Sequence, residues 1–394
     1  MKKAKIIVGA NFGDEGKGLM TNYFCHQATQ QGESCITVLH NGGAQRGHTV
    51  EYLNGLRHVF KHFGSGTFEK IPTYLSQDFI LNPIIFHQEW EELVKMGFTP
   101  EIYVDYRCRI TTPFDMMLNQ IIEESRGNFR HGSCGLGIYE TILRYENNQG
   151  ARLNDFVNLD DCNKIIEECK NAKKFLYQRT KQLKITETLK DWKNILGNFN
   201  IIDRYVDDFC FMLSKIKSVV DHDLFLQTYD TVVFENGQGL MLDMDNREYF
   251  PNLTPSHTGL YNPIKLLLKT VGSQEYLQKI GIEVCYVTRS YITRHGAGRL
   301  DRECSKDTIS QFINDKTNIT NSNQGALRFA KLDTNELYNR VIKDFEKNLN
   351  TKNGLSHKIS LALTHLNEYK IKPLESFDKI YYSYSPYVQE VESY

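Results

Sequence analysis

The stretch that most constrains the fold is an apolar run, Ile6–Val8, that leads directly into glycines, two carboxylates and a lysine. The sequence Gly9-Ala-Asn-Phe-Gly-Asp-Glu-Gly-Lys-Gly18 predicts a strand, a tight loop and then a helix. Glycines let backbone N–H groups approach an anion closely, and a helix N-terminus attracts negative charge. The loop departs from the standard P-loop, because Asn11 replaces its first glycine and Gly18 replaces its magnesium-binding hydroxyl. We therefore expect a phosphate site of a related kind.

A second apolar run, Ile36–Leu39, is followed by Asn41-Gly-Gly-Ala-Gln-Arg-Gly-His-Thr-Val50. Taken alone, either loop has a plainer explanation, since a Gly-Gly pair is usually a turn and a single histidine is usually structural. Two strand-to-glycine junctions close together near the N-terminus indicate one shared site. We expect the carboxylate of Asp14 and the imidazole of His48 to line one pocket there, on opposite sides of the bound molecule.

The composition narrows the class of protein. The chain has 394 residues, of which 40% are hydrophobic and 24% charged, and its formal net charge is -1. This balance is typical of a globular protein and gives no electrostatic reason to expect a nucleic-acid or membrane partner. Nine cysteines without a C-x-x-C pair argue against a disulfide framework. With no apolar segment of membrane-spanning length, we expect a cytoplasmic protein.

The remaining periodicity indicates alternating strands and helices. Strands are expected near 102–106 and 231–236, helices over 83–96 and 115–125, and an Asn-Gly hairpin between 51 and 60. The fold class is therefore α/β, with a mainly parallel central sheet, helices on both faces and a P-loop-like nucleotide-binding architecture. Residues 157–217 read as a helical insert within a single domain that covers residues 1–394.

Several motifs resemble those of the adenylosuccinate synthetase family. Asn11–Gly18 is similar to its Gln-Trp-Gly-Asp-Glu-Gly-Lys-Gly, and Gly42–Thr49 to its Gly-Gly-x-Asn-Ala-Gly-His-Thr. The stretch 234–243 resembles Phe-Glu-Gly-Ala-Gln-Gly-x-x-Leu-Asp, and 290–298 resembles Ala-Tyr-x-Thr-Arg-Val-Gly-Ala-Gly. The motifs occur in the family's order, and the resemblance covers nearly the whole chain apart from the helical insert.

This resemblance implies a ligase that joins IMP and L-aspartate, with cleavage of a nucleoside triphosphate, through a 6-phosphoryl intermediate to give adenylosuccinate. Asp14 would be the catalytic base, and His48 would donate a proton during phosphoryl transfer. The implied cofactor is Mg²⁺, bound by Asp14 and the carbonyl of Gly47. The plainer alternative is that Asp14 only caps the helix that follows.

The resemblance also implies two sets of binding residues and a homodimer, in which Arg144 would reach the substrate phosphate of the partner subunit. The residues expected to bind the phosphates and base of the nucleoside triphosphate are Gly13, Glu15, Gly16, Lys17, Gly18, Gly47, Thr49, Arg328, His365, Asn367 and Ser383. The residues expected to bind the substrate nucleotide are Gln45, Arg46, Ser133, Cys134, Arg144, Gln238 and Thr254.

Two departures leave the substrates open. In the stretch 319–328, where the family binds aspartate through several arginines, only Arg328 is present. Asn367 stands where the family has an aspartate, and an amide fits adenine at least as well as guanine, so the donor is GTP or ATP. Both features resemble the phage 2-aminoadenylosuccinate synthetases, which act on dGMP with an adenine triphosphate.

Asp14 argues against the phage alternative, because that branch tends to have a small residue at this position. A third possibility is a catalytically inactive nucleotide-binding homologue. The joint presence of Asp14, Lys17, His48 and Gln238 argues against it, since a protein that only binds needs no acid and base.

Overall fold

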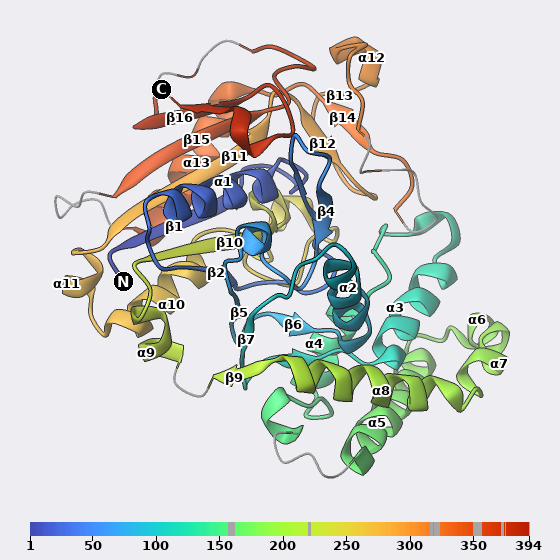
Figure 1. Ribbon diagram of the computed structural model, residues 1–394. Helices are drawn as coiled ribbons and strands as arrows, with labels where there is room; N and C mark the ends of the chain where they lie inside the picture. The colour runs from blue at the N-terminus through green and yellow to red at the C-terminus, as the bar shows by residue number, and fades with distance from the viewer. Residues whose placement is uncertain are drawn as a thin grey trace.

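The computed structural model describes residues 1–156, 162–219, 222–315, 318, 324–349, 357–371, 374 and 376–393. Its centre is a ten-stranded sheet (Figure 1). In spatial order the strands are β17 (Val391–Ser393), β16 (Lys379–Ser383), β15 (Lys358–Thr364), β11 (Gly281–Arg289), β1 (Lys3–Gly9), β10 (Thr231–Gly239), β2 (Cys35–Leu39), β5 (Thr73–Leu75), β7 (Ile102–Asp105) and β9 (Lys217–Val219). Strand β17 is antiparallel to β16, and the other neighbouring strands of this sheet pair in parallel.

Apolar side chains that alternate along β1 build a core on each face of the sheet. Ile7 lies in one hydrophobic cluster with residues of α1 (Lys17–Gln30), α2 (Pro83–Lys95) and α3 (Pro113–Ser125). Ile6 and Val8 lie in the opposite cluster with residues of α10 (Tyr261–Val271) and α13 (Thr334–Asn348). Helices therefore cover both faces, and the predicted α/β class is confirmed.

The parallel register brings the carboxyl ends of the central strands to one edge. Ile7 of β1 pairs with Glu235 of β10, and Glu235 pairs with Leu39 of β2. On the other side, Arg289 of β11 pairs with Thr364 of β15. The loops after these five strands therefore share one edge of the sheet, which is where open parallel sheets place their ligand sites.

Local signals in the sequence explain several of the expected elements. Helix α2 begins at Pro83, with the Asn82 side chain accepting a hydrogen bond from the Ile85 amide. The predicted hairpin is formed by β3 (His48–Glu51) and β4 (Arg57–Phe60), and Gly55 in its turn has a φ of +86°.

The described part of residues 157–217 is largely helical, and its status as an insert or subdomain stays a prediction. Residues 157–161 lie outside the described residues, and the helices that follow are α5 (Cys162–Gln182), α6 (Thr186–Asp191), α7 (Lys193–Leu196) and α8 (Asn200–Lys215). Figure 1 shows them gathered at one end of the molecule, near β9. The boundary at 217 needs correction, because Lys217 already belongs to edge strand β9. The expectation of one domain over residues 1–394 stays a prediction.

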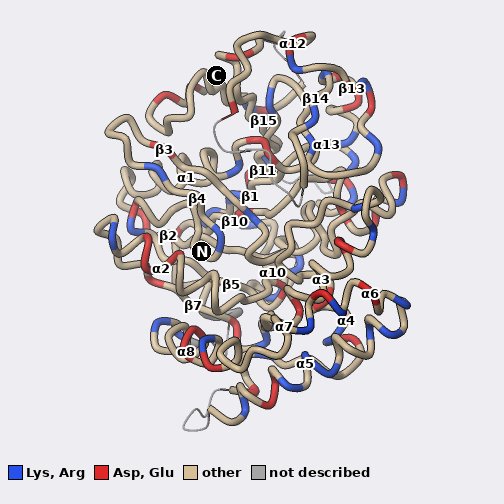
Figure 2. The backbone as a smooth tube through the Cα atoms, turned by 90° about the vertical axis from the view of Figure 1, so that its right-hand side faces the viewer, with Lys and Arg blue, Asp and Glu red and all other residues tan. Residues whose placement is uncertain are grey.

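Shorter elements complete the described fold. They are a sheet of β12 (Ile292–Arg294), β14 (Arg328–Ala330) and β13 (Glu303–Cys304), the pair β6 (Ile80–Leu81) and β8 (Arg109–Ile110), and the helices α4 (Ile138–Glu146), α9 (His222–Gln227), α11 (Gln274–Leu277) and α12 (Lys306–Ile309). Acidic and basic residues are interspersed along the helices of the insert (Figure 2). Among the described helices, none has both the length and the apolar content that a bilayer crossing requires.

Candidate functional site

The loop between β1 and α1 contains two glycines whose backbone φ angles lie in the left-handed region. Gly13 has a φ of +114° and Gly16 a φ of +96°. A Cβ atom on Gly13 would lie 2.9 Å from the Cα atom of Gln238, so this loop packs directly on the loop after β10. The Lys17 side chain is 1% exposed and donates a hydrogen bond back to the Gly13 carbonyl. The predicted glycine loop therefore exists, with its lysine folded into it.

Glu15 and Lys17 are a buried pair of opposite charge. Burial raises the pKa of Glu15 to about 7, although Lys17 and the Asn11 amide act in the opposite direction. Burial likewise lowers the pKa of Lys17. Oε1 of Glu15 accepts a hydrogen bond from the backbone N–H of Asn11, while Oε2 has no hydrogen-bond partner among the described residues. A partly protonated Glu15 repels a phosphate less than a full carboxylate would.

His48 lies in a buried polar cluster built on Glu235, a residue of β10. The Nδ1 atom of His48 is 2.5 Å from Oε1 of Glu235, and Nη2 of Arg46 is 2.7 Å from the same oxygen. Ser65 adds a backbone N–H at 2.9 Å from the other carboxylate oxygen. All of these residues are less than 9% exposed. One carboxylate therefore anchors both His48 and Arg46.

The pKa values of this cluster follow from burial and from Arg46. Burial and the nearby guanidinium lower the pKa of His48 to about 3, despite its hydrogen bond to Glu235. Burial alone would raise the pKa of Glu235, but Arg46, His48 and Ser65 outweigh it and hold that pKa at about 2. Nδ1 of His48 is occupied by two neighbours, Oε1 of Glu235 at 2.5 Å and Nη2 of Arg46 at 2.7 Å. Nε2 is therefore the nitrogen left for a ligand.

The two predicted loops touch each other. A Cβ atom on Gly18 would lie 3.1 Å from the Cβ atom of His48 and 2.8 Å from the carbonyl oxygen of Thr49. Glycine at this position lets the first turn of α1 pack against the start of β3. The structure therefore brings the Asp14 loop and the His48 loop together at one end of α1.

Asp14 faces a residue that the sequence did not single out. Its carboxylate is 30% exposed, and Oδ2 lies 3.3 Å from Nε2 of His295, which follows β12. Helix α1 has Gly16 as its N-cap and no side-chain cap hydrogen bond. The alternative in which Asp14 only caps this helix is therefore contradicted.

Several buried polar atoms at this edge have no hydrogen-bond partner among the described residues. They include Oε1 of Gln45 and both Nε and Nη1 of Arg46. Gln238 occupies a left-handed conformation with a φ of +67°, next to the glycine loop. Buried donors and acceptors without partners are costly unless a ligand or water meets them. These side chains are therefore suited to contact a bound molecule.

The loop 131–137, which contains the expected substrate-binding residues Ser133 and Cys134, reaches the same region. A Cβ atom on Gly132 would lie 2.5 Å from the Cα atom of Gly296, beside His295. The amides of Gly132 and Ser133 both donate to Oε2 of Glu123, and the Ser133 hydroxyl donates to Asn119. Burial raises the pKa of the Cys134 thiol, which makes it a weak polar partner.

Arg144 needs correction. Its side chain is 0% exposed, and its Nε and Nη2 atoms lie 2.8 and 3.0 Å from the carboxylate oxygens of Asp115. Its Nη1 atom donates to Glu168 and to the carbonyl of Gln149. A fully buried guanidinium with these partners has no N–H group free for a phosphate, in its own subunit or in another.

Arg328 is paired within the protein, and its expected role as an anion receptor stays a prediction. Its Nε and Nη2 atoms donate to the two carboxylate oxygens of Glu303, and Nη1 donates to the carbonyls of Gly296 and Gly298. This bidentate pair occupies the face that a carboxylate or phosphate would need. Residues 319–323 of the expected aspartate loop lie outside the described residues.

The motif expected to read the donor base follows β15. The hydroxyl of Thr364 donates to the Glu15 carbonyl at 2.8 Å, which places this strand end against the glycine loop. His365 has a φ of +60°, and Asn367 is exposed in the turn that follows. Ser383 is 2% exposed and its hydroxyl donates to the Ser385 carbonyl at 2.6 Å, so that hydroxyl is already engaged.

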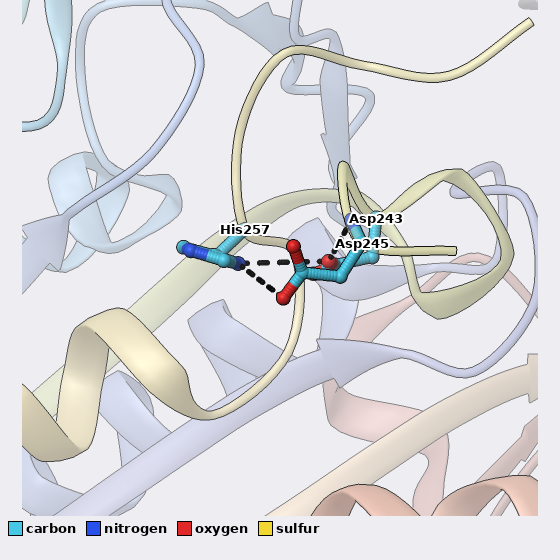
Figure 3. Close-up of side chains that lie close together, drawn as sticks. All are labelled: Asp243, Asp245 and His257. Atoms are coloured by element: carbon cyan, nitrogen blue, oxygen red, sulfur yellow. Dashed lines mark hydrogen bonds and ion pairs between the residues drawn. The ribbon is translucent and has the colours of Figure 1, made fainter. Parts of the chain in front are cut away.

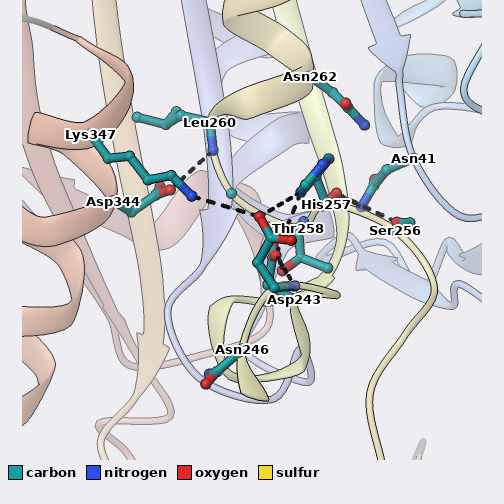
Figure 4. A network of polar contacts seen from close by, with 12 residues as sticks. Asn41, Asp243, Asn246, Ser256, His257, Thr258, Leu260, Asn262, Asp344 and Lys347 are labelled. Atoms are coloured by element: carbon teal, nitrogen blue, oxygen red, sulfur yellow. Dashed lines mark hydrogen bonds and ion pairs between the residues drawn. The ribbon is translucent and has the colours of Figure 1, made fainter. Parts of the chain in front are cut away.

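The segment from β10 to α10 contains Thr254, whose amide donates to the Leu242 carbonyl at 2.9 Å. The same segment holds an acidic cluster, in which Nδ1 of His257 lies 3.5 Å from Asp243 and 3.8 Å from Asp245 (Figure 3). Asp243 also accepts from the Thr258 amide at 2.7 Å (Figure 4). Lys347 lies 3.7 Å from Asp245. The Thr258 hydroxyl donates to the Gly239 carbonyl at 2.9 Å, which fastens the segment to the end of β10, and we assign no metal to the cluster.

Sequence reasoning missed three site residues: Glu235, His295 and Arg289, whose Nε donates to the backbone carbonyl of Asp14. Glu235 and Arg289 occur at the ends of the apolar runs that form β10 and β11, and a charged residue at the end of a buried strand is a usable signal. Nothing in the local sequence around His295 indicated that its ring would face Asp14.

Comparison with known proteins shows the family to which the chain belongs. The sequence model of the adenylosuccinate synthetase family matches residues 6–360. The chain is 28% identical over 334 residues to the adenylosuccinate synthetase of Alkaliphilus metalliredigens, a match covering 81% of the chain and 69% of that relative. The chain is 27% identical over 290 residues to the adenylosuccinate synthetase of Desulforamulus reducens, and this match covers 72% of the chain and 62% of that relative. The chain thus spans about two thirds of the length of these relatives.

Two solved structures share the fold. Adenylosuccinate synthetase from Plasmodium falciparum superposes with a TM-score of 0.63 at 20% identity, covering 99% of this chain and 86% of that one. The succinoaminodeoxyadenylate synthetase of cyanophage S-2L, solved with dGMP and dATP, gives a TM-score of 0.65 at 14% identity, with coverages of 100% and 95%. The family match over most of the chain decides the assignment: this protein belongs to the adenylosuccinate synthetase family, a family of purine-biosynthetic ligases.

Proposed function

We propose that the protein joins IMP and L-aspartate to form adenylosuccinate, with cleavage of a nucleoside triphosphate. The observation that carries the proposal is the contact of Gly18 with His48, since it unites the Asp14 loop and the His48 loop beside buried, unpartnered polar atoms. A protein that only binds nucleotides has no need for a carboxylate and an imidazole at the same edge.

The proposed roles follow from the chemistry of the purine. Asp14 takes the proton from N1 of IMP, so that O6 becomes a nucleophile for the γ-phosphoryl group of the triphosphate. The aspartate amine then attacks C6, and the bond between C6 and the phosphorylated oxygen breaks to release phosphate. His48, fixed by Glu235 through Nδ1, presents Nε2 to the phosphoryl oxygens. The negative charge of these oxygens favours a proton on Nε2, against the lowering of the His48 pKa by burial and by Arg46.

The Asp14 carboxylate and the Gly47 carbonyl are hard oxygen donors, which fit Mg²⁺. The Asp14 side chain is partly exposed and Gly47 is an exposed residue. When bound, Mg²⁺ would neutralise charge on the transferred phosphoryl group. The glycine loop with Lys17, and then Thr49 and Asn367, would hold the triphosphate, which is GTP or ATP.

The second candidate is synthesis of 2-aminoadenylosuccinate from dGMP with an adenine triphosphate. Two observations favour it. The cyanophage enzyme solved with dGMP and dATP shares the fold over the whole chain, and an exposed amide at Asn367 suits adenine. IMP stays the first candidate, because the phage branch tends to have a small residue where this chain has Asp14.

A product assay decides between these reactions. The protein is incubated with Mg²⁺, aspartate and each pairing of IMP or dGMP with GTP, ATP or dATP, and the succinylated nucleotide is identified by mass spectrometry. We expect the adduct of IMP. An adduct from dGMP alone would reverse the order of the two candidates.

A third outcome, in which nucleotides bind but no adduct forms, would identify a binding protein. Asp14→Asn separates the cases, because an enzyme loses turnover and keeps nucleotide affinity. The homodimer stays part of the proposal, although the burial of Arg144 removes the residue expected to cross the interface. Light scattering coupled to size exclusion measures the assembly directly.

A further inference from the structure

His295 stands where the family motif given above has valine, and its ring faces the proposed catalytic base. Nε2 lies 3.3 Å from Oδ2 of Asp14 and 3.0 Å from Oδ1 of Asn318. The ring is 16% exposed. Among the described residues, no other side chain pairs with the Asp14 carboxylate. Valine could make neither contact.

The residues behind His295 determine which of its nitrogens carries the proton. The Asn318 amide nitrogen Nδ2 donates to Asp315 at 2.7 Å, and its backbone N–H donates to the same carboxylate at 2.9 Å. Arg289 donates to Asp315 at 2.8 Å and, together with Asn318, lowers the pKa of this carboxyl, although burial opposes the shift. An ionised Asp315 accepts only, so it fixes Asn318 with Oδ1 toward the ring. The nitrogen facing Oδ1 must then donate, which puts the proton on Nε2.

The same chain of contacts returns to Asp14. Arg289 holds Asp315 with Nη2 and donates from Nε to the backbone carbonyl of Asp14. The ring of contacts therefore runs from the Asp14 carboxylate through His295, Asn318, Asp315 and Arg289 to the Asp14 main chain. A closed network of this kind fixes both the backbone and the side chain of one residue.

We propose that His295 is a positioning residue for Asp14. Its Nε2–H donates to Oδ1 of Asn318, and the same edge of the ring lies 3.3 Å from Oδ2 of Asp14, so that Oδ1 of Asp14 is left to face the purine N1–H. The inference rests on the proposed role of Asp14 as the base. A carboxylate on a loop otherwise rotates between several orientations, and only some of them place an oxygen within reach of N1.

The kinetic test compares three variants. His295→Val removes the donor, His295→Gln restores an N–H close to the position of Nε2, and His87→Val removes a remote histidine paired with Asp208 at 2.7 Å. For His295→Val we expect kcat to fall by about 10- to 100-fold, with KM for the nucleotide monophosphate changed by less than about threefold. His295→Gln should recover most of kcat, and His87→Val should match the wild type. Thermal melting shows whether each variant is folded.

An NMR experiment tests the pair without turnover. Two-bond ¹H–¹⁵N spectra of the apo protein should show the Nε2–H tautomer for the signal that disappears in His295→Val. The opposite tautomer, an unchanged kcat in folded His295→Val, or equal losses in the valine and glutamine variants would each refute the inference. A wild-type protein that makes no succinylated nucleotide would instead refute the proposed function, while the tautomer would still report on the hydrogen bond from Nε2 of His295 to Asn318.

Discussion

At the scale of single residues, Glu235 is the residue on which the His48 side of the site depends. It is 0% exposed and accepts hydrogen bonds from His48, Arg46 and Ser65. A carboxylate in the interior is stable only where such donors replace water. The charge that orients a proposed catalytic histidine therefore also neutralises a buried arginine.

Replacing Glu235 by glutamine keeps the shape and removes the charge. The buried guanidinium of Arg46 then lacks a counterion, and we expect the free energy of unfolding to fall by about 3–5 kcal/mol. Urea unfolding at pH 7 measures the change. Glu187→Gln is the matched control, because Glu187 is 83% exposed and pairs with Lys190 at the surface. That control should change stability by less than about 1 kcal/mol. A similar loss in both variants would contradict the argument.

At the scale of elements, the start of α2 depends on a buried histidine. The amide of Asn82, the N-cap of this helix, donates to Nε2 of His62 at 3.0 Å. His62 is 0% exposed, and burial lowers its pKa to about 3. An accepting Nε2 requires a ring without a proton on that nitrogen. The contact is therefore present while His62 is neutral.

This predicts a specific pH dependence of stability. The pKa of His62 is about 3 in the folded protein and about 6.5 in the unfolded chain. Between these values the unfolded chain binds the extra proton, so this contribution to stability is lost as the pH falls. His62→Gln keeps an acceptor that does not titrate. The advantage of the wild type over this variant should shrink by about 2 kcal/mol from pH 7 to pH 5, measured by urea unfolding. A difference that stays constant would show that His62 is not buried as a neutral ring.

The elements also show how far the sequence determines the structure. The strands and helices around the glycine loops were predictable, because apolar runs, Asn82-Pro83 and Asn54-Gly55 are local signals. Strands of two or three residues, such as β9 and β13, are too short to show an alternating pattern. Arg144 was assigned wrongly because its partner Asp115 lies 29 residues away in sequence. His295 was missed because Asp14, the residue that its ring faces, is likewise far away in the sequence.

At the scale of the whole molecule, the candidate site is assembled from distant parts of the chain. Residues of the first 50 positions meet β10, the loop after β12 and the end of β15 at one edge of the sheet. A ligand that bridges these loops binds only the folded chain. Its binding energy therefore adds to the free energy of unfolding of the entire sheet.

We therefore expect each true substrate to raise the urea midpoint, with a gain of about 2.7 kcal/mol at one hundred times its dissociation constant. Comparing IMP with dGMP, and GTP with ATP, ranks the substrates without requiring turnover. Lys17→Met should abolish the stabilisation by the triphosphate and leave that by the monophosphate, because the Lys17 charge lies in the glycine loop. Equal loss of both effects would mean that the two nucleotides do not occupy separate parts of this edge.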